Sequence, residues 1–140
     1  MSSVPLALLL LRASRWFDAR LLERLSLRGW PALSPAQSLV FAHLPEDGIS
    51  PAELARRVGT SRQAAHQLLG GLVDLGLLQV VADPTRERGR LVVLTGTGRD
   101  LARDAAAVLA DLEMIYGQQR SQVLRAVLEV EHTDGPARPR

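Results

Sequence analysis

The sequence contains no cysteine, so disulfides, thiolate metal ligands and thiol-based redox sensing are excluded. Lysine is absent too, and all 17 basic residues are therefore arginine. Asparagine is also missing, whereas alanine, glycine, proline and leucine are abundant, a bias typical of a GC-rich genome. The number of arginines thus indicates little about function by itself, whereas their positions along the chain are informative.

Long hydrophobic runs are lacking as well. The run at residues 6–11 is far shorter than the roughly 20 residues that a membrane span needs. No basic residue precedes it, and Arg12 and Arg15 follow it where a secretory signal would have small residues at its cleavage site. We therefore expect a cytoplasmic protein without membrane contact. Its 140 residues, 46% of them hydrophobic, suffice for one domain with its own core, expected at residues 1–130.

Signatures of metal binding and catalysis are also missing. The three histidines, His43, His66 and His132, form no cluster with each other or with carboxylates at ligand spacing. The sequence has no glycine-rich phosphate loop and no nucleophile elbow. We therefore expect neither an enzyme nor a bound metal or cofactor.

What the sequence does contain is apolar residues at helical spacing, bounded by serine, proline and glycine. Ser34 and Gln37 predict a capping box at the start of the second helix, Ser50 gives the same start signal for the third, and Gly59 ends the third. Thr60 or Ser61 would cap the fourth of the predicted helices. The helices are expected at residues 6–27, 35–44, 51–58, 61–75 and 97–130, the last interrupted near Gly117. The chain is therefore expected to be mainly α-helical.

A small β-hairpin follows the fourth helix. Residues 77–81 and 90–94 are rich in valine and leucine and predict two strands joined by a charged tip. Two helices with a short glycine-bearing turn, followed directly by a hairpin, are typical of a winged helix-turn-helix. We expect this core at about residues 34–95, and a disordered tail at residues 131–140.

The fourth predicted helix has a polar face opposite its apolar one. Glutamine can pair bidentately with adenine and arginine with guanine, so such a face could read base edges in a major groove about 12 Å wide. Alternatively, these side chains form an ordinary solvated helix face, and Gln63 could also close a capping box with Thr60. The candidate DNA-binding residues on this face are Ser61, Arg62, Gln63, His66 and Gln67.

The charge distribution favours DNA binding. Between residues 54 and 90 there are six arginines and only three acids. Three of these arginines, Arg86, Arg88 and Arg90, belong to the hairpin, where they would face a DNA backbone. They complete the set of candidate DNA-binding residues.

Several segments together resemble the MarR family (multiple antibiotic resistance regulators). They are LSPAQ at 33–37, LARRVGTSRQ at 54–63, LVDLGLL at 72–78, and DP at 83–84 followed by LT at 94–95 and Gly98. The resemblance extends over roughly residues 5–128. It implies a homodimeric transcriptional regulator that binds double-stranded DNA at a palindromic operator. It also implies that the helix from Ser61 is the recognition helix, that the hairpin is the wing, and that Arg88 enters the minor groove.

The sequence departs from the family pattern at several positions. Arg86 stands where the family commonly has an aspartate that braces the wing arginine. Gly70 and Gly71 lie within the recognition helix, and each costs about 1 kcal/mol relative to alanine. Leu75 and Val80 replace residues that are often basic in relatives. These departures leave open an alternative function, a dimeric winged-helix interaction module that does not bind an operator.

Both ends of the chain carry apolar helical stripes that a small core cannot bury, at about residues 5–29 and 97–130. We expect them to form the interface of a homodimer; the alternative is that they pack on the core of their own chain. Relatives often bind a small aromatic effector between these helices and the DNA-binding lobe. Side chains that could line such a cavity are Trp16, Phe17, Trp30, Phe41, His43 and Tyr116.

Overall fold

The computed structural model describes residues 3–129, so the predicted tail at 131–140 lies outside the described residues. As predicted, the chain is mainly helical with one antiparallel two-stranded hairpin. Its elements are α1 (Leu6–Leu27), α2 (Pro35–Ala42), α3 (Pro51–Val58), α4 (Arg62–Asp74), β1 (Leu78–Ala82), β2 (Arg90–Leu94), α5 (Gly96–Tyr116) and α6 (Gln118–Leu128).

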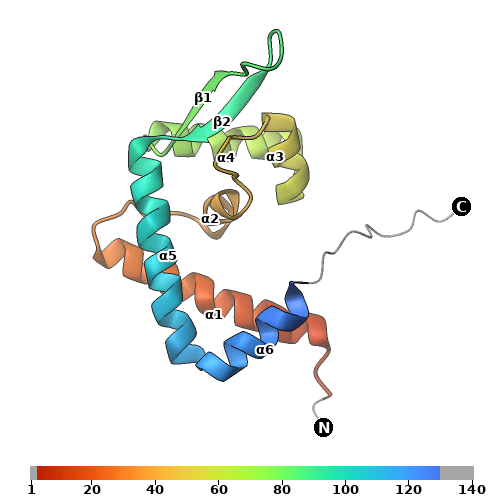
Figure 1. Ribbon diagram of the computed structural model, residues 1–140, viewed down its shortest axis with the longest axis vertical. Coiled ribbons are helices and arrows are strands. Elements are labelled where there is room, and N and C mark those ends of the chain that lie inside the picture. Colours follow the sequence, from red (N-terminus) through yellow and green to blue (C-terminus); the bar gives the residue numbers. More distant parts are fainter. Residues whose placement is uncertain (1–2, 130–140) are drawn as a thin grey trace, which may run out of the picture.

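The long helix α5 connects the two ends of the molecule (Figure 1). At one end, α2, α3, α4 and the hairpin form a lobe, and α5 starts beside the hairpin. At the other end, α1 and α6 pack against α5. The fold thus separates a helix-turn-helix with its wing from a pair of terminal helices.

Serine caps and glycine stops set the short helices. Ser34 and Gln37 form the predicted capping box, with the Gln37 N–H donating to Ser34 Oγ and the Ser34 N–H donating to Gln37 Oε1, both at 3.0 Å. Gly59 ends α3 with a φ of 74°, a conformation that favours glycine. Ser61 caps α4 by accepting the N–H of Ala64 at 3.1 Å. A capping box between Thr60 and Gln63 is therefore ruled out.

One hydrophobic core joins the helix-turn-helix lobe to α5. Ile49 extends the hairpin by exchanging two backbone hydrogen bonds with Val92, at 3.1 and 2.8 Å. The most deeply buried side chains of this core are Val40, Leu54, Leu72, Leu77, Leu78, Val92, Leu101, Val108 and Leu112.

This core corrects one expectation from the sequence. Leu101, Val108 and Leu112 of the C-terminal apolar stripe are at most 2% exposed within the single chain, so they are not available to a partner. Ile115, which continues the same stripe, is 60% exposed. The stripe is therefore shared between the chain's own core and its surface.

The two adjacent glycines of α4 differ in their surroundings. The helix runs continuously through both. A Cβ on Gly71 would lie 3.0 Å from Nε2 of Gln37, so Gly71 lets α2 pack closely. A Cβ on Gly70 would meet nothing within 4 Å, because this glycine lies on the exposed side of the helix.

Gly98 is the glycine with the least space. A Cβ there would lie 2.0 Å from the carbonyl oxygen of Leu77, because the first turn of α5 packs directly on the turn between α4 and β1.

Across residues 3–129, no helix combines the length and the hydropathy that crossing a membrane requires.

We expect Gly98→Ala and Gly70→Ala to have opposite effects on the free energy of unfolding. Gly98→Ala forces α5 away from the Leu77 carbonyl and should destabilise the fold by more than the ~1–3 kcal/mol typical of overpacking. Gly70→Ala should stabilise it by about 1 kcal/mol, the helix-propensity difference between the two residues. Urea unfolding followed by circular dichroism would check both. Equal stability of the Gly98 variant and the unaltered protein would contradict the close contact.

Candidate nucleic-acid interface

Helix α4 presents all of its predicted DNA-binding residues to solvent. Its inner face is held by Ala65, Leu69 and Leu72, which are buried. The exposed side chains on the outer face are Ser61, Arg62, Gln63, His66 and Gln67. Arg62, Gln63 and His66 line a concave surface between α3 and α4. The structure therefore brings these residues together on one accessible surface.

Ser61 has a structural task besides any contact with a ligand. Its hydroxyl oxygen accepts the Ala64 N–H and so satisfies one of the free amides at the start of α4. Gln63, by contrast, has no role as a cap, because Ser61 is the N-cap and Ala64 occupies the position that a capping box would use. Its side chain is available for recognition.

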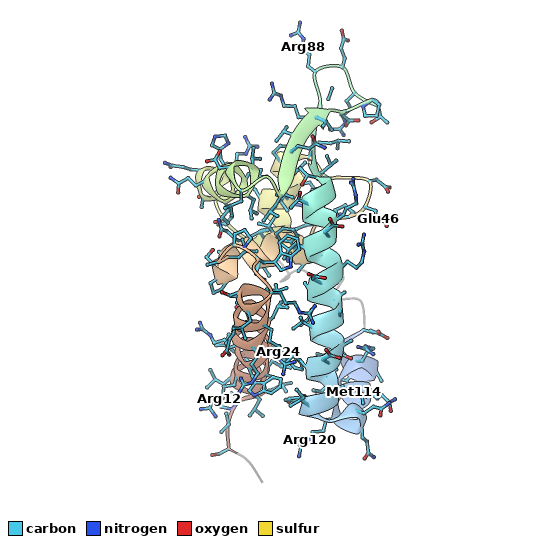
Figure 2. The ribbon with its side chains drawn as sticks, turned by 90° about the vertical axis from the view of Figure 1, so that its left-hand side faces the viewer. Arg12, Arg24, Glu46, Arg88, Met114 and Arg120 are labelled. Carbon is cyan, nitrogen blue, oxygen red and sulfur yellow. The ribbon has the colours of Figure 1, made fainter. Side chains whose placement is uncertain are left out.

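The hairpin carries the second group of predicted residues. Arg86, Arg88 and Arg90 are all exposed, and Arg88 lies at the tip, at the opposite end of the molecule from Arg12 and Met114 (Figure 2). Arg88 has a φ of 61°, the only positive φ of a non-glycine residue within residues 3–129. In the same part of the chain, none of these three arginines takes part in an ion pair.

Glu53 is a residue of this lobe that the sequence reasoning missed. Arg56 Nε donates to Glu53 Oε2 at 2.8 Å, and Arg57 Nε donates to Glu53 Oε1 at 3.2 Å. The hydrogen bond from Arg56 is the main reason that the pKa of Glu53 falls from 4.5 to about 2. The spacings i,i+3 and i,i+4 on a predicted helix could have revealed this cluster.

The Glu53 cluster changes the charge balance of the lobe. Arg56 and Arg57 belong to the basic excess counted from residue 54, but Glu53 offsets one of their two charges. Among the six arginines between residues 54 and 90, those that form no ion pair with a described acid are Arg62 on α4 and the three of the hairpin. A polar groove lined by Glu53, Arg56, Arg62, Asp83, Thr85 and Arg86 connects the two elements.

The other end of the molecule has an extensive apolar surface. Leu6 is 70% exposed, Met114 64% and Val127 64%. Trp16, Phe17 and Tyr116 pack together beside this surface, with ring centroids 4.9 to 5.4 Å apart, and the Arg20 guanidinium lies 4.2 Å from the Trp16 ring. The exposed apolar residues of this surface are Leu6, Leu8, Leu9, Leu11, Met114, Ile115, Val123, Val127 and Leu128.

An apolar cavity of about 270 Å³ lies between α1, α2 and α5. It is lined by leucines and alanines of all three helices, together with Phe41 and the hydroxyl-bearing Ser38. Of the six side chains predicted to line an effector site, Phe41 is the one that lines this cavity. Phe17 and Tyr116 line a separate groove between α1, α5 and α6, and Trp30 Nε1 donates to Asp104 Oδ2 at 2.7 Å.

No metal site is present in residues 3–129, where no group of three histidines or acids is arranged to hold an ion. The arrangement of α3, α4 and the hairpin defines a winged helix-turn-helix protein. Residues 33–89 match the sequence model of the MarR family. The chain belongs to the MarR family of transcriptional regulators, whose members are regulators rather than enzymes.

Solved structures agree with this assignment. Transcriptional regulator PA3341 is 31% identical, with a TM-score of 0.67 over 89% of this chain and 93% of the other. CouR from Rhodococcus jostii RHA1, bound to p-coumaroyl-CoA, is 20% identical with a TM-score of 0.68 over 95% of this chain and 100% of CouR. A MepR variant from S. aureus, bound to an oligodeoxyribonucleotide, is 15% identical with a TM-score of 0.60 over 89% and 94% of the two chains. Among curated proteins, no sequence matches significantly.

The Glu53 cluster predicts how stability depends on pH. Because the folded-state pKa of about 2 lies below the ordinary 4.5, ionised Glu53 stabilises the fold fully above pH 4.5, and this contribution is lost as the pH falls toward 2. Glu53→Gln should therefore lose less stability than the unaltered protein between pH 4.5 and 2. Urea unfolding at a series of pH values measures the difference.

The matched control is Glu46→Gln, which alters an acid of the loop before α3 that has no ion pair within residues 3–129. Its loss of stability at low pH should follow that of the unaltered protein. A Glu53→Gln profile that coincided with both would show that the cluster adds nothing to stability.

Proposed function

We propose that this MarR-family regulator binds a palindromic DNA operator as a homodimer, and that a small aromatic effector releases it. The observation that carries the proposal is that α4 and the hairpin, which both expose amide or guanidinium groups, lie next to each other. The exposed face of α4 and the unpaired arginines of the hairpin belong to one lobe, joined by a polar groove. Operator binding would place the protein with the DNA in the cytoplasm.

Helix α4 has the side chains that major-groove recognition requires. Gln63 and Gln67 are exposed amides, and each could pair bidentately with the N6 and N7 edge of adenine. Arg62 could pair with guanine or contact a phosphate. Gly70 continues the same exposed face without a side chain, so the backbone there could approach the DNA closely.

The hairpin suits the minor groove. A narrow minor groove has an enhanced negative potential that attracts an inserted guanidinium, and Arg88 at the tip forms no ion pair with an acid of residues 3–129 that would compete for it. Arg86 and Arg90 lie on either side of the tip and could contact the flanking phosphates. Glu53 offsets one of the two charges of Arg56 and Arg57, so these residues could add to the attraction of the hairpin for phosphate.

The apolar surface at the far end of the molecule supports the homodimer. Its nine exposed residues come from α1, α5 and α6 and are too extensive a set to leave in water. A second copy of the chain offers an identical surface, so a two-fold axis would bury both. The same axis would place the two recognition helices on the half-sites of a palindrome.

The cavity between α1, α2 and α5 supports the effector. Its lining has one hydroxyl, that of Ser38, and is otherwise apolar, which suits a small aromatic molecule. The cavity lies where the terminal helix α1, helix α2 of the helix-turn-helix lobe and the connecting helix α5 meet. An effector that binds in this cavity and moves α1, α2 and α5 apart would change the relative positions of the two recognition helices.

Base readout can be tested with Gln67→Ala, and with Gln119→Ala on α6 as the matched control. Loss of a bidentate base contact should lower affinity for the operator by about 1–3 kcal/mol while leaving affinity for random DNA nearly unchanged. Fluorescence anisotropy with a site selected from a random duplex library measures both affinities. Equal losses on operator and random DNA would argue against readout, and no binding to either would favour the interaction-module alternative.

The dimer predicts different outcomes for two neighbouring substitutions on α5. Ile115→Glu places a charge in the exposed apolar surface, and we expect a folded monomer, because an unpaired charge in an apolar interface is strongly unfavourable. Leu112→Glu places it in the chain's own core and should prevent folding. Multi-angle light scattering and circular dichroism distinguish the two. A monomeric mass for the unaltered protein at micromolar concentration would refute the dimer.

A further inference from the structure

The tip of the hairpin, residues 83–89, is held by Asp83. One carboxylate oxygen, Oδ1, accepts the N–H of Thr85 at 2.8 Å and the hydroxyl of Thr85 at 2.7 Å. The N–H of Asp83 donates to the carbonyl of Gly89 at 2.8 Å and so closes the tip. The side chain of Asp83 therefore holds the first residues of the tip, while its main-chain N–H marks the point at which the chain returns.

The two halves of the tip are in close contact at Gly89. A Cβ on Gly89 would lie 2.8 Å from Cβ of Arg86 and 3.0 Å from Cβ of Asp83. Arg88, the residue just before Gly89, has the left-handed φ of 61° that side-chain-bearing residues rarely adopt. The backbone of Arg88 thus depends on the turn that Asp83 and Gly89 close.

We infer that the side chain of Asp83 is a positioning group for Arg88: by holding Thr85, it orders the tip and so the backbone that presents the Arg88 guanidinium to DNA. The inference rests on the proposed function. Arg86, two residues before Arg88, cannot act as an acidic brace, and no described residue forms an ion pair with Arg88. The hydrogen bonds of Thr85 also hold the pKa of Asp83 below its usual value, so its carboxylate stays ionised as an acceptor.

A positioning role and a purely electrostatic role of Asp83 predict opposite changes in DNA affinity for Asp83→Ala. An aspartate next to DNA repels phosphate, so removing its charge would by itself strengthen binding. If Asp83 positions Arg88, Asp83→Ala weakens binding instead. Glu87 provides the matched control within the same tip, because it is exposed and makes no hydrogen bond or ion pair within residues 3–129.

The experiment compares Asp83→Ala, Asp83→Asn, Glu87→Ala and Arg88→Ala by fluorescence anisotropy on the selected operator. Asp83→Ala should bind about three- to tenfold more weakly, the factor expected for net loss of a hydrogen bond. Asp83→Asn keeps an acceptor for Thr85 and should bind at least as tightly as the unaltered protein. Glu87→Ala should bind more tightly. Asp83→Ala should add little to Arg88→Ala, since the first residue acts through the second.

Two results would overturn the inference. One is that Asp83→Ala binds DNA more tightly, by the same factor as Glu87→Ala. Removal of a negative charge would then explain the whole effect. The other is an undiminished effect of Asp83→Ala in the Arg88→Ala background.

A second measurement needs no DNA. Trypsin cleavage after Arg86 and Arg88, followed by mass spectrometry, should be several-fold faster in Asp83→Ala than in Asp83→Asn or the unaltered protein, at unchanged melting temperature. If the unaltered protein binds no DNA, the proposed function fails, but this rate still tests the brace. Equal cleavage rates in Asp83→Ala and the unaltered protein would show that Asp83 does not hold the tip.

Discussion

The contact between the first turn of α5 and the turn at Gly76 and Leu77 fixes the relative positions of the functional elements. The Thr95 N–H donates to the Leu77 carbonyl at 3.1 Å, and the Thr95 hydroxyl donates to the Gly76 carbonyl at 2.6 Å. The same hydroxyl caps α5 by accepting the Gly98 N–H at 3.0 Å. Because α4 ends, the hairpin starts and α5 begins at this point, one threonine joins α4, the hairpin and α5.

The features that the sequence predicted correctly are those that depend on neighbouring residues. The Ser34 and Gln37 capping box, the Ser50 cap and the Gly59 stop each involve side chains within four positions of one another, so their signals are visible without the fold. The boundaries of α1 and β2 follow from apolar periodicity for the same reason. Glu53 was equally local, and it was missed because the basic excess was counted from the next residue.

Features that depend on contacts between distant residues could not be predicted from the sequence. Leu112 and Ile115 belong to one apolar stripe, yet only the tertiary packing around α5, chiefly that of α1, decides that the first is buried and the second exposed. The polar face of α4 was predictable from its periodicity, whereas the left-handed backbone of Arg88 depends on the closed tip. Sequence patterns therefore located the candidate interface, and the tertiary contacts determined how its residues are presented.

The length and continuity of α5 give the fold a mechanical property. Its 21 residues span about 30 Å at 1.5 Å per residue, from the terminal helices to the hairpin. A tilt of about 10° at the end near α1 and α6 would swing the other end sideways by roughly 5 Å, which exceeds the ~3.4 Å rise of one base pair. In the proposed dimer, a small rearrangement at the subunit interface would thus be amplified along α5 into a change of register on DNA.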